Sequence, residues 1–188
     1  MAVIPLRPLE EIDDPRQLEM LEKARGLNVP DEQFFQVLTQ APGYAEALFD
    51  ALYRSHASGI VDHKLKEIIR VQLARRAGDP YFASLRSSKA LQAGLTEDDI
   101  EAGCGDFEND SRFSTAEKWA LRYGYLMFRE PQKVNREFYQ EGKTHYSEAE
   151  IVELGAFIAL HYGLQVFMRT LKLEPHPPRP EKPISTPR

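Results

Sequence analysis

Two charged residues near the middle of the chain have the chemistry of a small-molecule site. Glu67 lies in a helix predicted to begin after Asp62, and Arg86 lies in the helix predicted to follow it. Glu67 shares its helix face with apolar residues, and burial raises the pKa of a carboxyl toward values that suit proton transfer. Arg86 stays protonated, so it can hold a carboxylate or an oxyanion but cannot act as a general acid or base.

Each of these residues also has an ordinary structural interpretation. The Glu67 carboxylate could form a helix-surface pair with Lys64, Lys66 or Arg70. Arg86 could form a salt bridge that holds the bundle or a subunit interface together. If Glu67 and Arg86 face each other, their ion pair would lower the glutamate pKa and make it a poor acid at neutral pH.

Two histidines are further candidates for proton transfer. His56 ends the helix before this pair, and its ordinary interpretation is an exposed histidine. His161 lies in the last apolar helix, where a core histidine with one hydrogen bond is common. Tyr81 and Phe82 open the second central helix, where they would either wall an aromatic pocket or pack in the core. The candidate site therefore has Glu67, His56 and His161 as catalytic residues, with Arg86, Tyr81 and Phe82 binding substrate.

The elements that must position these residues are two central helices between Asp62 and Leu95. Apolar residues recur at helical spacing in the first, with Asp62 as its N-cap. Gly78 should end it, and Pro80 should start the second, which we expect to continue to Gly94. The second helix is rich in small residues, which allow close approach of another helix, so we expect it at the centre of a bundle.

The remaining elements are also predicted to be helices, and no strand pattern is credible, so the fold class is all-α. Capping boxes at Ser114 and Ser147 open two later helices. The helix after Ser147 is apolar nearly all round, which predicts that it is buried. Its Glu153 echoes the early position of Glu67, and we expect it on an exposed face.

Length and composition predict one domain over residues 1–173, with an extended arm at 1–12 and a tail at 174–188. The tail holds six of the 13 prolines, which excludes a helix there. The net charge of -5 argues against nucleic-acid binding. We see no membrane span and no signal peptide, so we expect a cytoplasmic protein with no membrane partner. One cysteine, Cys104, excludes an intrachain disulfide.

The order of these elements over about residues 34–172 resembles the carboxymuconolactone decarboxylase and alkylhydroperoxidase D superfamily. The similarity begins at FFQVLTQAPGYAEALF, continues through VDHKLKEIIRVQLARRAGDPYFASLRSSKALQAGL and ends with SEAEIVELGAFIALHYGLQVFMRTLKL. The resemblance implies a compact helical subunit that assembles into trimers, hexamers or dimers.

The motif of the peroxidase branch is altered in this chain. The resemblance places its two cysteines at Asp79 and Phe82 and its histidine at Arg86, while its upstream glutamate is matched by Glu67. Without two thiols, the disulfide relay that reduces a hydroperoxide should be absent, and Cys104 lies outside the motif. The decarboxylase branch also lacks the cysteines, but it generally keeps a histidine at the position of Arg86.

These observations favour an enzyme that uses general acid/base chemistry, without cofactor or metal, on a small organic acid, lactone or carbonyl compound. We see no metal-ligand spacing and no glycine-rich phosphate loop. The alternative is a ligand-binding or structural oligomer without catalysis, in which Glu67 and Arg86 form a closed salt bridge. An alkylhydroperoxidase-like antioxidant activity is the third and least favoured interpretation.

Overall fold

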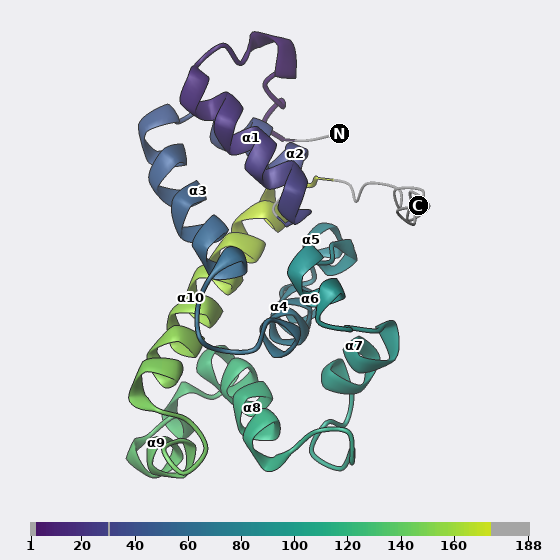
Figure 1. Cartoon of the computed structure of the whole chain (residues 1–188), viewed down its shortest axis with the longest axis vertical. Helices are drawn as coiled ribbons and strands as arrows, with labels where there is room; N and C mark the ends of the chain where they lie inside the picture. The colour runs from purple at the N-terminus through teal and green to yellow at the C-terminus, as the bar shows by residue number, and fades with distance from the viewer. Residues whose placement is uncertain (1–2, 30, 174–188) are drawn as a thin grey trace, which may run out of the picture.

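The computed structural model describes residues 3–29 and 31–173, and these ranges contain helices and no strand, which confirms the all-α prediction (Figure 1). The predicted tail lies outside the described residues. In chain order the helices are η1 (Leu9–Glu11), α1 (Pro15–Leu27), α2 (Glu32–Leu38), α3 (Pro42–Ala57), α4 (His63–Ala77), α5 (Pro80–Ser84), α6 (Ser88–Gln92), α7 (Glu97–Cys104), α8 (Thr115–Arg129), η2 (Pro131–Lys133), α9 (Arg136–Gly142) and α10 (Glu148–Leu171).

The helix at the centre of the molecule is α4, which packs against α5, α6, α7, α8 and α10 (Figure 1). Ten consecutive residues of α4, Leu65–Ala74, are buried. Asp62 caps its start by accepting from the Leu65 N–H at 3.0 Å, and Gly78 ends it in the left-handed conformation with φ of 66°. Because every face of α4 is covered, its polar residues are enclosed with the apolar ones.

The second central helix is broken, contrary to our prediction of one helix from Pro80 to Gly94. The structure has α5 and α6 instead, and Leu85 and Ser87 between them are extended. The break has a chemical cause, because the carbonyls of Phe82 and Leu85 accept from the Arg70 guanidinium at 2.7 and 2.6 Å. The backbone at this point therefore bonds to side chains of α4.

The long helix α10 lies across α4 and joins the two ends of the molecule (Figure 1). By length and composition α10 is apolar enough to cross a membrane. The core helix of a soluble protein also meets this criterion. We predicted burial nearly all round, but only one face, including Leu154 and Ile158, is buried, while Val152 and Val166 on the other face are exposed. The predicted capping boxes at Ser114 and Ser147 are confirmed.

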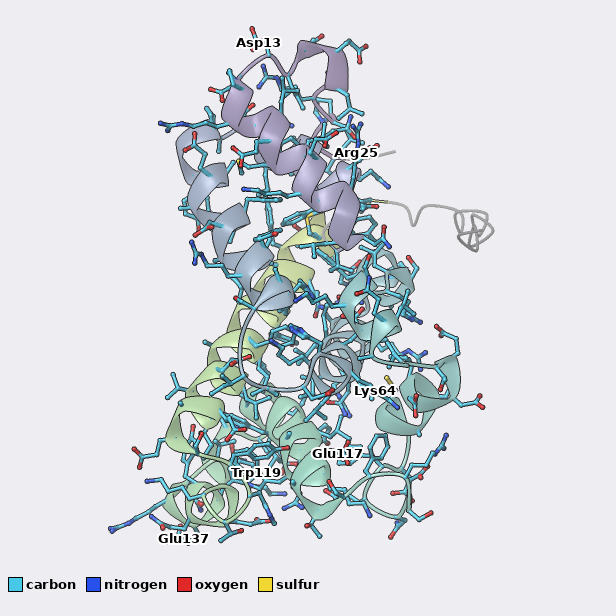
Figure 2. The ribbon with its side chains drawn as sticks, viewed as in Figure 1. Asp13, Arg25, Lys64, Glu117, Trp119 and Glu137 are labelled. Atoms are coloured by element: carbon cyan, nitrogen blue, oxygen red, sulfur yellow. The ribbon has the colours of Figure 1, made fainter. Side chains whose placement is uncertain are left out.

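The far end of the molecule is closed by an aromatic cluster around Trp119 of α8, whose indole N–H donates to the Phe138 carbonyl at 3.1 Å (Figure 2). After α8 the chain forms the short η2 at Pro131, and α9 begins at Arg136 under an Asn135 cap. In the described part of the N-terminal arm, residues 3–12, η1 is the only helix, and the Val3 N–H donates to the Leu171 carbonyl at the end of α10.

Candidate functional site

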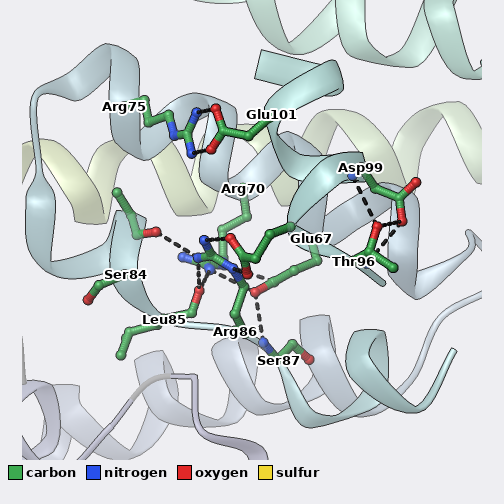
Figure 3. A network of polar contacts seen from close by, with 12 residues as sticks. Glu67, Arg70, Arg75, Ser84, Leu85, Arg86, Ser87, Thr96, Asp99 and Glu101 are labelled. Atoms are coloured by element: carbon green, nitrogen blue, oxygen red, sulfur yellow. Dashed lines mark hydrogen bonds and ion pairs between the residues drawn. The ribbon is translucent and has the colours of Figure 1, made fainter. Parts of the chain in front are cut away.

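The Glu67 carboxylate forms a buried ion pair with Arg70, one turn further along α4 (Figure 3). Arg70 donates from Nη2 to Glu67 Oε1 at 2.7 Å and from Nε to Oε2 at 2.9 Å. The Ser87 N–H adds a third bond to Oε1 at 2.7 Å. The side chains of the pair are 1% and 0% exposed, so both are withdrawn from solvent.

This arrangement determines the protonation state of Glu67. Burial opposes its ionisation, but the adjacent Arg70 guanidinium and the Ser87 N–H outweigh burial, so the pKa of Glu67 lies below its ordinary value. Both carboxylate oxygens are already bonded. Glu67 is therefore ionised at neutral pH and, in this conformation, is a poor general acid.

Arg86 forms a salt bridge within the bundle, which was one of its two interpretations. Its guanidinium pairs with Glu97 of α7 at 2.8 Å from both Nε and Nη2, and its Nη1 donates to the Ala83 and Leu85 carbonyls. The physical reason is the break between α5 and α6, which turns this segment away from the helical path. Arg86 thus joins the segment to α7.

The other residues predicted to bind substrate lie in the core. Tyr81 and Phe82 are fully buried beside Phe34, and the Tyr81 hydroxyl bonds to Asp31. Asp79, which precedes them, caps α5 by accepting from the Tyr81 N–H at 3.0 Å. This places both rings in packing positions, which was the ordinary interpretation of them.

The two candidate histidines lie together, with ring centroids 4.9 Å apart and Phe157 against both. His56 is buried, whereas its ordinary interpretation was an exposed histidine. It is buried because its ring packs against Phe157 and His161 of α10. Burial lowers the pKa of His56 to about 3, and that of His161 well below its ordinary value. Both imidazoles are therefore neutral at pH 7, and each has one nitrogen lone pair.

A cleft of about 310 Å³ lies beside this pair, between the end of α3, the loop after it and α10. Ser55 is the link between the cleft and the histidines, since it lines the cleft and its Oγ lies 3.1 Å from His161 Nε2. The same hydroxyl lies 2.7 Å from the Leu52 carbonyl. The residues lining the cleft are Ala51, Arg54, Ser55, Ser58, Gly59, Lys66, Glu153, Ala156, Phe157 and Leu160.

The polar wall of this cleft is formed by Lys66 and Glu153. The Lys66 ammonium pairs with Glu153 Oε1 at 2.8 Å and donates to the Ser58 carbonyl at 3.1 Å. Glu153 also accepts from the Ile60 N–H at 2.7 Å. We predicted that Glu153 would lie on an exposed face, and the structure contradicts this prediction. It is instead held by the loop between α3 and α4.

Ser55 was missed from the sequence, and Lys66 and Arg70 were considered only as surface partners of Glu67. The signal for Arg70 was its position three residues after Glu67 in a helix with apolar residues on every side. Ser55 had no such signal, because its contact with His161 depends on how α3 crosses α10. Among the described residues, no group of His, Cys, Asp and Glu side chains could hold a metal ion.

No protein-family model matches the chain, and no curated protein matches it. Solved structures do match it. The debrominase Bmp8 without ligand is 20% identical, with 91% of each chain covered and a TM-score of 0.75. A cysteine-to-alanine variant of Bmp8 in complex with 2,3,4-tribromopyrrole is 20% identical, with 94% of each chain covered and a TM-score of 0.77.

A third structure is an alkylhydroperoxidase AhpD core, an uncharacterized peroxidase-related protein from Ralstonia eutropha JMP134. It is 14% identical, with a TM-score of 0.73, over 93% of this chain and 92% of that one. The chain has the alkylhydroperoxidase D-like fold. This confirms the fold expected from the resemblance, and the AhpD-like fold also accommodates enzymes, as Bmp8 shows. At these identities the likeness concerns the fold, so any activity must be argued from the site.

Proposed function

We propose that this protein is a cofactor-independent enzyme that transfers a proton to or from a small carbonyl compound, such as an organic acid or a lactone. The observation that supports this proposal is the contact of Ser55 with His161 at the wall of a cleft. The cleft volume of about 310 Å³ is at the small end of ligand pockets. A small, largely apolar substrate fits such a space.

In this proposal His161 is the base and Ser55 carries the proton to it. The Ser55 hydroxyl hydrogen turns from the Leu52 carbonyl toward His161 Nε2 while the hydroxyl oxygen accepts a proton from the substrate carbon. A neutral imidazole is required for this step, and burial keeps His161 neutral by lowering its pKa. His56, packed against His161, lies further from the cleft and holds the ring in place.

Lys66 has the role of stabilising the negative charge that forms on the substrate oxygen. Its ammonium lines the same cleft and uses two of its three donors on the described residues Glu153 and Ser58. A donor fixed in a largely dehydrated position stabilises an enolate more strongly than water does. Glu67 and Arg70 lie near His56, where their opposite charges act on the His56 pKa in opposite directions and the ion pair maintains the fold.

The experiment is a deuterium-exchange screen. Simple 2-oxo acids, 3-oxo acids and γ-lactones are incubated with the protein in D₂O, and loss of the proton next to the carbonyl is followed by NMR. We expect exchange with at least one class, and a decrease of about 100-fold or more in His161→Gln, which is checked for folding by circular dichroism. Unchanged exchange in folded His161→Gln would exclude this base.

A second candidate function, ligand binding without catalysis, is favoured by the state of Glu67. The glutamate that the superfamily uses is here fully bonded to Arg70 and Ser87. If none of the compounds exchanges but one of them shifts the NMR signals of cleft residues, binding without turnover is the better interpretation. A hydroperoxidase is less favoured, because Asp79 and Phe82 occupy the positions of the two thiols.

A further inference from the structure

The cleft beside Ser55 is continued by a second cleft along the same two helices. The second cleft has a volume of about 470 Å³ and lies between the first half of α3 and the second half of α10. Leu160 lines both clefts, so they adjoin. The residues lining the second cleft are Val37, Leu38, Ala41, Tyr44, Leu48, Ala159, Leu160, Gly163, Leu164 and Phe167.

The two clefts form one groove, because each of its walls is a single helix face. On α3 the lining residues of this face are spaced four, three and four apart: Tyr44, Leu48, Ala51 and Ser55. On α10 the spacing is the same, through Ala156, Leu160, Gly163 and Phe167. We call this the α3–α10 groove, with Ser55 at one end and Phe167 at the other.

The α3–α10 groove changes from polar to apolar along its length. At the Ser55 end, its wall includes the ion pair of Lys66 with Glu153. At the far end none of the described residues that line it is charged, and the hydroxyl of Tyr44 is their only polar side-chain group. Tyr44 and Phe167 are 70% and 43% exposed there, although aromatic rings gain free energy from burial. The chemistry that matches this groove is an amphiphile, with one polar and one apolar end.

We propose that the α3–α10 groove binds a carbonyl compound with an unbranched, medium-length alkyl chain. The carbonyl lies at Ser55 and Lys66, and the chain runs toward Tyr44 and Phe167. This inference rests on the proposed function and names its substrate class. Seven residues of helix separate Ala51 from Tyr44, so the apolar part of the groove is about 10 Å long. An extended chain of about eight carbons has this length.

Gly163 provides room for the chain. It lies in the wall of the apolar end, and a Cβ there would meet no described atom within 4 Å. Gly26 and Gly43 are equally open but line neither cleft, so the distinguishing feature of Gly163 is its place in the groove. A leucine at this position would fill the groove without a clash in the fold, and leucine favours a helix more than glycine does.

The first test is the binding of saturated fatty acids, which have no keto group and therefore report on the groove independently of any reaction. Sodium butanoate, hexanoate and octanoate are titrated into the protein and followed by NMR. We expect each added CH₂ group to lower the Kd by about two- to fourfold, as apolar burial does. Octanoate should also shift the signals of Tyr44 and Phe167, whereas butanoate should shift only those at the Ser55 end.

The variant Gly163→Leu tests where the chain lies. It should raise the Kd of octanoate by about 10-fold or more and flatten the dependence on chain length. The matched control is Gly26→Leu, the same substitution at an exposed position of α1, which should bind octanoate as wild type does. Octanoate that binds no tighter than butanoate, or Gly163→Leu that binds octanoate as tightly as wild type, would overturn the proposal.

Deuterium exchange separates this inference from the proposed function. With 3-oxobutanoate and 3-oxooctanoate as substrates, we expect the longer compound to have the higher kcat/KM, by about 10-fold or more. Equal exchange of the two compounds would overturn the inference and leave the proposed function in place. Chain-dependent binding of octanoate without exchange of either compound would support the groove as an amphiphile site and overturn the proposed function instead.

Discussion

Glu67 and Arg70 lie one turn apart on the most enclosed helix of the molecule and form a bidentate ion pair there. The pair also bonds the backbone of Phe82, Leu85 and Ser87, which is where the second central helix is interrupted. Its main effect is therefore to fix the segment between α5 and α6 against α4. In this conformation both carboxylate oxygens of the glutamate that sequence reasoning assigned to catalysis are bonded to Arg70 and Ser87.

The first prediction concerns the stability of Glu67→Gln. Loss of the charge leaves the Arg70 guanidinium buried and uncompensated, so we expect the free energy of unfolding to decrease by about 3–5 kcal/mol in urea titration. The matched control is Glu97→Gln, which breaks the more exposed pair with Arg86 and should cost about 1 kcal/mol or less. Equal losses in the two variants would mean that the Glu67 pair has no special structural weight.

The second prediction concerns acid sensitivity. His56 and His161 are neutral in the folded state, with His56 at a pKa of about 3, while the unfolded chain takes up protons near the ordinary value of 6.5. A lowered folded pKa means that stability is complete above pH 6.5 and is lost as the pH falls below it. We expect a loss of about 1.4 kcal/mol per pH unit for each histidine.

Urea titrations at pH 8, 7, 6 and 5 measure this slope. His56→Phe should lower this slope by about half, because phenylalanine takes up no proton. The packing should be kept, since a phenylalanine ring can make the same edge contact with Phe157. A free energy of unfolding that is independent of pH over this range would show that the histidines are not buried as neutral groups.

The third prediction concerns Asp79, whose titration has the opposite sign. Burial raises its pKa to about 6, and its Oδ2 has no hydrogen-bond partner among the described residues. At pH 7 the folded state therefore carries the cost of an ionised, buried carboxylate. Asp79→Asn keeps the oxygen that caps α5, so we expect a gain in the free energy of unfolding of about 1–3 kcal/mol at pH 7.

The pH dependence distinguishes this cause from a change in packing. Because the folded pKa is raised, the gain from Asp79→Asn should shrink as the pH falls below 6 and should vanish near the ordinary aspartate value of 3.8. A constant gain at every pH would attribute the effect to the amide itself.

The local signals in the sequence predicted the helices well. Asp62, Gly78, Ser114 and Ser147 each start or end a helix where expected, because caps and left-handed glycine act within a few residues. The prediction failed at Leu85, where local propensity favours one continuous helix. There the backbone bonds to Arg70, a tertiary contact that no pattern in the segment itself could reveal.

The site was predicted less well, for a related reason. His56 and His161 were identified as candidates because histidine is a residue type that transfers protons, and in the structure they lie together. Ser55, which contacts His161, was missed, because it lies one residue before His56 and so on a different face of the helix. Arg86 was considered either as an anion clamp facing Glu67 or as a salt bridge, and beside the break in the second helix it pairs with Glu97. Distances between helices, unlike positions along one helix, depend on how all of them pack.

The most direct test of the proposed site compares Ser55→Ala with Ser58→Ala in the deuterium-exchange assay. Both serines line the cleft, and each hydroxyl donates to a backbone carbonyl of α3. Of the two serines, only Ser55 also contacts His161. We predict that Ser55→Ala lowers the exchange rate by about 100-fold and that Ser58→Ala changes it by about twofold or less. Equal rates in the two variants would contradict the assignment of this cleft as the reactive site.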